Sequence, residues 1–126
     1  MQNKLKNTNG GIDGSDGDVC GEVQFWAMND GTPSETKFGN IQVAAVDVTN
    51  GQEAGKMEMQ VAEYDGTPTT GLKLDGDTNA DGEIDVTIGA GAASTTTIAG
   101  DLDIDGTAAA GSNFCTYLTG HKLIGS

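Results

Sequence analysis

The chain has 126 residues and a formal net charge of −13, and its six basic residues are all lysines. This charge excludes nucleic acid as a partner, because no basic patch exists to displace phosphate counterions, and it argues against adsorption to an anionic membrane. Ile, Leu, Val and Phe together supply only 23 residues, so the chain lacks the apolar side chains to complete a core alone and self-association is expected.

The first 76 residues divide into an arm and a β-rich segment. Residues 1–21 are polar, glycine-rich and acidic towards their end, which is typical of a flexible N-terminal arm. Residues 22–76 alternate apolar and polar side chains in four runs that turn signals separate, which predicts an antiparallel four-stranded β meander. Asn50-Gly51 is the strongest of these turn signals, and a change of phase at Ala45-Val46 predicts a β-bulge.

The alternation also predicts which side chains share a face of the meander. Trp26 is expected on the face opposite to the apolar one. The apolar face is expected to carry Val23, Phe25, Ile41, Val43, Met57, Met59, Val61, Leu72 and Leu74.

The last third of the chain has a different character. Residues 77–106 hold an acidic loop and then short β runs at 85–88, 95–99 and 102–104, which glycine-rich corners separate. Runs this short hold together when chains wind around one another or stack, so we expect β shaft repeats intertwined in a homotrimer. Residues 107–126 are expected to be a C-terminal tail or a truncated next module.

The acidic loop has the spacing of half a calcium site. Asp77, Asn79 and Asp81 alternate as ligand positions 1, 3 and 5, Gly82 follows as the sharp turn, and Glu83 would offer its carbonyl. Position 12 falls on Ile88 instead of a bidentate carboxylate, so a further ligand would have to come from Asp75 or Asp85. The alternatives are a weak calcium site and a solvated acidic turn, and no cofactor is required.

Other chemistry has little support in the residues. The single histidine, His121, stands near the end of the sequence without a nucleophile motif around it, so no catalytic residues and no enzymatic activity are predicted. Trp26 and Tyr64 are side chains that can stack on a sugar, although a lone Trp more often lies in a core or an interface. Cys20 and Cys115 are either a disulfide or two buried thiols.

The run "KFGNIQVAAVDVTNGQEAGKMEMQVAEYDGTPTTGLKLDGD", residues 37–77, resembles a β module of bacteriophage tail fibres and other virion structural proteins, of the marine-phage type. The following "VTIGAGAASTTTIAGDLDIDGT", residues 86–107, is similar to the shaft repeats of such fibres. The resemblance implies a homotrimeric all-β fibre segment of the virion that serves particle architecture or host attachment. Its partners would be other copies of itself, other virion proteins and a host surface glycan or receptor.

Three functions remain open at this point. The first is a trimeric virion protein, assembled in the host cytoplasm and released with the extracellular particle. The alternatives are a subunit of an acidic extracellular filament and a small calcium- or carbohydrate-binding β module. The opening "MQNKLKN" lacks the apolar centre of a secretory leader, and this feature and the fibre-like repeats favour the virion protein over the small binding module. The uncharged stretch 86–100 is too short and polar to span a bilayer.

Overall fold

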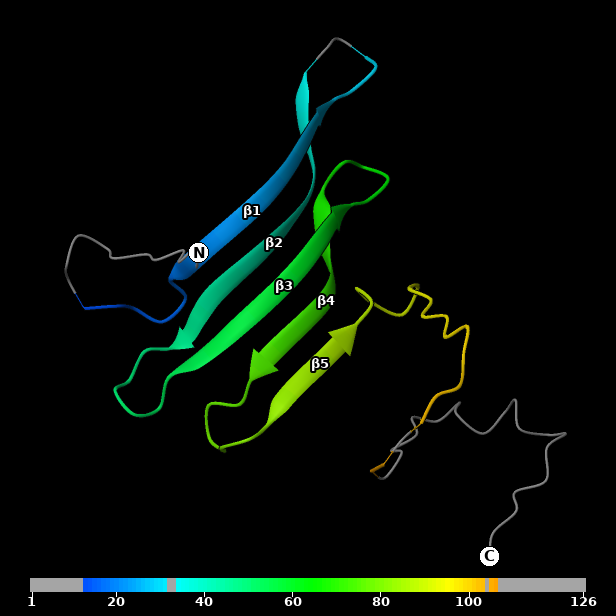
Figure 1. Cartoon of the computed structure of the whole chain (residues 1–126). Coiled ribbons are helices and arrows are strands. Elements are labelled where there is room, and N and C mark those ends of the chain that lie inside the picture. Colours follow the sequence, from blue (N-terminus) through cyan, green and yellow to red (C-terminus); the bar gives the residue numbers. More distant parts are fainter. Residues whose placement is uncertain (1–12, 32–33, 104, 107–126) are drawn as a thin grey trace, which may run out of the picture. The chain divides into compact units, whose positions relative to one another are not determined.

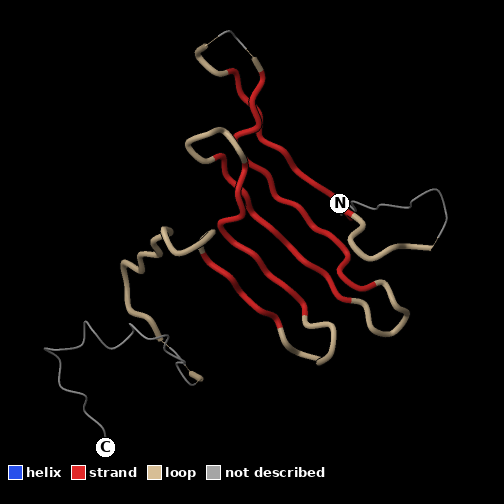
Figure 2. Tube along the Cα trace, turned by 180° about the vertical axis from the view of Figure 1, so that it is seen from behind, coloured by secondary structure: helices blue, strands red, loops and turns tan. Residues whose placement is uncertain are grey.

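A computed structural model describes residues 13–31, 34–103 and 105–106. This part of the chain is all-β and contains no helix. Each strand pairs antiparallel with the next along the chain, and the five lie side by side in one open sheet (Figures 1 and 2). The strands are β1 (Val19–Met28), β2 (Glu35–Asp47), β3 (Ala54–Ala62), β4 (Pro68–Gly76) and β5 (Ile84–Ile88). The predicted all-β class and antiparallel meander are confirmed, with one strand more than predicted.

The additional strand is the run that the sequence placed at the start of the shaft. β5 pairs with β4 from Leu72↔Ile88 to Gly76↔Ile84. The chain divides into two compact units, Met1–Thr96 and Thr97–Ser126, and the sheet belongs to the first. The other predicted shaft runs form no strand in residues 89–103.

The predicted β-bulge in β2 is confirmed. Ala45 pairs with Gly55 and Asp47 pairs with Ala54, so Val46 is the extra residue. Two further register shifts each insert one extra residue into a strand. Phe38 is the extra residue of β2 in its pairing with β1, opposite Phe25 and Trp26. Gly71 is the extra residue of β4 in its pairing with β3. The sheet is therefore a bulged meander rather than a regular one.

The turn after β2 has the hairpin geometry that Asn50-Gly51 predicts. Gly51 has a φ of 83°, a left-handed conformation that glycine adopts without steric penalty. The Gln52 amide donates to the Thr49 carbonyl at 2.8 Å. At the start of the turn, hydrogen bonds from the backbone amide and the hydroxyl of Thr49 hold the pKa of Asp47 below its ordinary value.

The described end of the predicted arm is bound to the sheet. β1 begins at Val19, three residues before the expected start, and residues 14–18 turn beside the end of β2. The Gly17 amide donates to the Ala45 carbonyl at 2.8 Å, and the Asp16 carboxylate accepts from the Val48 amide at 3.0 Å. The acidic residues of this segment thus cap backbone amides that the sheet leaves open.

The strand register sorts the side chains onto two faces. On one face, the row Val23–Ile41–Met59–Leu72–Ile88 crosses all five strands, and the row Gly21–Val43–Met57–Leu74–Val86 lies beside it. We call this the apolar face; its large side chains are Val23, Phe25, Ile41, Val43, Met57, Met59, Val61, Leu72, Leu74, Ile84, Val86 and Ile88. The other, the polar face, carries Trp26, as predicted.

The apolar face is not buried by the described chain. Val61 is 65% exposed, Phe25 54% and Met59 42%. In the described residues only Gly39, Asn40 and Ala44 are buried. The nine predicted core residues therefore share one face as expected, but they do not form a buried core within one chain. A single sheet with one exposed apolar face is an incomplete folding unit, because stable domains cover such a face with a second layer.

Candidate functional site

The predicted calcium residues lie in the turn between β4 and β5, at residues 77–83. The Asp77 Oδ1 accepts hydrogen bonds from the amides of Asn79 at 2.5 Å and Ala80 at 3.1 Å. The Asp77 amide donates to the Glu83 carbonyl at 3.2 Å, and Gly82 has a φ of 81°. One carboxylate oxygen and the carbonyl expected to bind calcium are thus engaged in closing the hairpin.

The structure brings one acidic residue to this turn that the sequence analysis missed. Glu53, at the end of the β2–β3 turn, lines the same polar hollow as Asp77, Asn79 and Asp81. In an antiparallel meander the second and fourth turns lie at the same end of the sheet, so the topology could have indicated this neighbour (Figure 1). The Glu53 Oε2 accepts from the Gly51 amide at 3.1 Å.

The two residues considered as additional ligands lie opposite each other on neighbouring strands. Asp75 in β4 pairs with Asp85 in β5, on the polar face. The Asp75 carboxylate binds the Lys73 ammonium at 2.6 Å, and this hydrogen bond raises the pKa of Lys73. In residues 13–31, 34–103 and 105–106 no group of three or more His, Cys, Asp or Glu side chains is arranged to hold a metal.

Calcium binding by Asp77, Asn79, Asp81 and Glu83 stays a prediction, and heating experiments check it. If these residues bind calcium with a Kd near ~0.1 mM, 1 mM calcium should stabilise each chain by about 1.4 kcal/mol, because ligand stabilisation grows as RT ln(1 + [L]/Kd). We expect a rise in Tm with calcium that Asp77→Ala removes. Removing this carboxylate also removes the cap on two amides, so the variant's metal-free Tm is the reference for its own response.

Magnesium is the matched control for this measurement. Screening of the −13 charge stabilises the protein with either ion, whereas a site of flexible oxygen ligands prefers the larger calcium ion. Equal shifts with calcium and magnesium, in wild type and in Asp77→Ala alike, would show that the segment is only an acidic turn.

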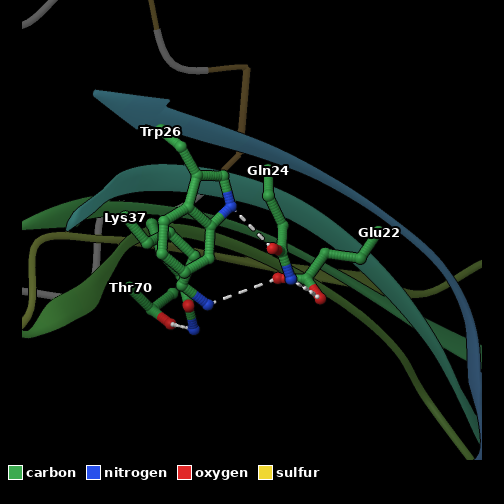
Figure 3. A network of polar contacts seen from close by, with 6 residues as sticks. Glu22, Gln24, Trp26, Lys37 and Thr70 are labelled. Carbon is green, nitrogen blue, oxygen red and sulfur yellow. Dashed lines mark hydrogen bonds and ion pairs between the residues drawn. The ribbon is translucent and has the colours of Figure 1, made fainter. Parts of the chain in front are cut away.

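A second candidate site is the polar face, where side chains form two hydrogen-bonded groups. The Trp26 indole Nε1 donates to the Gln24 Oε1 at 2.8 Å, and the Gln24 Nε2 donates to the Glu22 Oε2 at 2.8 Å. The Lys37 ammonium lies 3.5 Å from the other Glu22 oxygen. Figure 3 shows these four residues on one side of the arched ribbon, with Thr70 nearby.

The second group lies on β3 and β4. The Gln60 Nε2 donates to the Thr70 Oγ1 at 3.0 Å, and that hydroxyl donates to the Glu58 Oε1 at 3.3 Å. Between the groups, Asn40 is 3% exposed, and its Oδ1 has no hydrogen-bond partner in the described protein. These contacts hold the long polar side chains against the sheet.

The two aromatic residues considered for sugar stacking lie on different elements. Trp26 is 53% exposed at the end of β1, and Tyr64 is fully exposed in the turn between β3 and β4. No contact joins them, so the geometry offers two separate rings rather than one platform. Carbohydrate binding stays a prediction.

Several other candidates fall partly or wholly outside the described residues. His121 and Cys115 lie outside them, and so does any bond between Cys115 and Cys20. Within the described ranges, no helix has the length and apolar character that crossing a bilayer requires.

Comparison of the sequence with protein-family models and with curated proteins, and of the fold with solved structures, finds no match.

Proposed function

We propose that the protein is a structural component of a bacteriophage particle, a homotrimer of the tail-fibre type that serves particle architecture or host attachment. The observation that supports this role is the single-layer sheet with its exposed apolar face. A chain that exposes the side chains of its own core is suited to be a subunit, because association provides the missing second layer.

The sequence resemblance supports the proposal that this assembly is part of a phage particle. Residues 37–77, which resemble the tail-fibre module, coincide with most of β2, all of β3 and β4, and the turns between them. The short runs after residue 88 suit a segment that is completed by neighbouring chains. The strong negative charge suits a particle protein that stays soluble and binds no nucleic acid.

The assembled mass in solution tests this proposal. A trimer should show three times the chain mass of 12.8 kDa by light scattering at micromolar concentration, without growth on concentration. A stable, folded monomer would contradict the proposal. A mass that grows with concentration would favour the acidic extracellular filament instead, because a head-to-tail contact that does not close propagates into a fibre.

A further inference from the structure

The apolar face carries no charged side chain from any of the five strands. Alternation along the strands places all their charged residues on the polar face, as the pairs Glu22↔Gln42, Glu58↔Lys73 and Asp75↔Asp85 illustrate. In a chain with a net charge of −13, this is the surface on which two copies can meet without bringing carboxylates together.

The area of this face suits a protein interface. Eight of its large side chains are exposed, with exposed fractions from 37% for Met57 to 65% for Val61. With their half-buried neighbours they offer on the order of 800 Å², which is the area that one partner contributes to a stable interface of standard size. The face also has a hollow, which Phe25, Phe38 and Val61 line together with their neighbours on β2 and β3.

The two ends of the chain offer few large apolar side chains to cover it, and two described apolar side chains that follow the sheet, Ile98 and Leu102, are themselves 52% and 61% exposed. Residues 1–12 and 107–126 contain Leu, Ile, Phe or Tyr at only seven positions, against twelve large apolar side chains on the face. In a trimer, three copies can turn their uncharged rows towards one another around the assembly axis, so that each face meets the other two. We propose that the apolar face packs against the apolar faces of the other copies of this chain. This inference rests on the proposed self-assembling role and names the surface that carries it.

A pair of lysine substitutions on β5 tests the assignment in the full chain. Val86 lies on the apolar face and is 57% exposed, so a single sheet accommodates Val86→Lys, whereas an interface would have to bury the new charge. Thr87→Lys puts the same charge on the polar face of the same strand. By sedimentation velocity, Val86→Lys should weaken self-association by at least about tenfold, and Thr87→Lys should change it by less than about twofold.

Salt provides an independent readout in the same experiment. Added sodium chloride should strengthen association of the wild type, because it screens repulsion between acidic copies while leaving an uncharged interface intact. An interface built from the Lys and Glu side chains of the polar face would weaken instead, and that result would overturn the assignment.

Thiol accessibility tests the assignment without a charged substitution. With Cys20 and Cys115 replaced by Ser, the thiol of Val86→Cys should be protected from a water-soluble thiol reagent in the assembly and should react on dilution. The thiol of Thr87→Cys should react in both states. Equal reactivity, or an oligomer that Val86→Lys leaves unchanged, overturns the choice of face while the proposed self-assembly stands. A monomeric wild type overturns both.

Discussion

Replacement of Val43 by Asp should abolish folding or assembly. Val43 pairs with Gly21 in β1 and with Met57 in β3, so it lies in the middle of the apolar face and is already half-buried in one chain. No cationic side chain of the five strands lies on that face to pair with the new carboxylate. Burial of an unpaired charge costs several kcal/mol, which is a large part of the 5–15 kcal/mol that stabilises a typical domain. Far-UV circular dichroism measures the loss of folding, and sedimentation velocity measures the loss of assembly.

Gln42→Asp is the matched control for this substitution. It introduces the same charge one residue away, on the polar face, where it lies opposite Glu22 and Glu58. Like charges directly opposite each other on a sheet destabilise by about 1 kcal/mol or less, so this variant should still fold and assemble. If Val43→Asp assembled as well as Gln42→Asp, the assignment of Val43 to a face that becomes buried would be wrong.

Gly39→Ala should destabilise the protein by about 2 kcal/mol or more, although it adds only one methyl group. A Cβ at Gly39 would lie 2.7 Å from the carbonyl oxygen of Gln60. That oxygen belongs to the backbone of the neighbouring strand, so it can move only by distorting the pairing of β2 with β3. Urea unfolding at one fixed protein concentration measures the effect as a lower midpoint.

Gly71 provides the control for the general effect of replacing glycine in a strand. A Cβ at Gly71 meets nothing within 4 Å, so Gly71→Ala should be neutral or stabilise by up to about 0.5 kcal/mol through the unfolded chain. A similar loss of stability in both variants would show that the close approach at Gly39 is not the cause.

Alternation of apolar and polar residues was sufficient to predict most of the sheet. It predicted the strands around Val43, Met59 and Leu74, their shared face and the bulge at Val46, because side chains on a strand alternate with a period of two. It did not show that β5 joins the sheet. The turn at 77–83 resembles a metal loop, and a run of five residues with three apolar side chains suits a shaft repeat as well as a fifth strand.

The candidate sites were harder to predict because they depend on which turns and strands become neighbours. Glu53 and Asp77 line the same hollow although they lie 24 positions apart in the sequence. Their proximity follows only from the number of strands between them. The hydrogen bonds that occupy Asp77 depend on the geometry of its own turn. Likewise, the link from Trp26 through Gln24 to Glu22 depends on rotamers, which no alternation pattern specifies.

The segregation of charge between the faces has a consequence for the colloidal behaviour of the proposed assembly. An assembly that buries the apolar face would display the carboxylates of every copy outwards, and their mutual repulsion would keep particles dispersed. That repulsion fades as the pH falls towards about 4, where free Asp and Glu side chains become protonated. Mild acid would therefore flocculate such particles before it opened the uncharged contacts inside them, and neutral buffer would disperse them again.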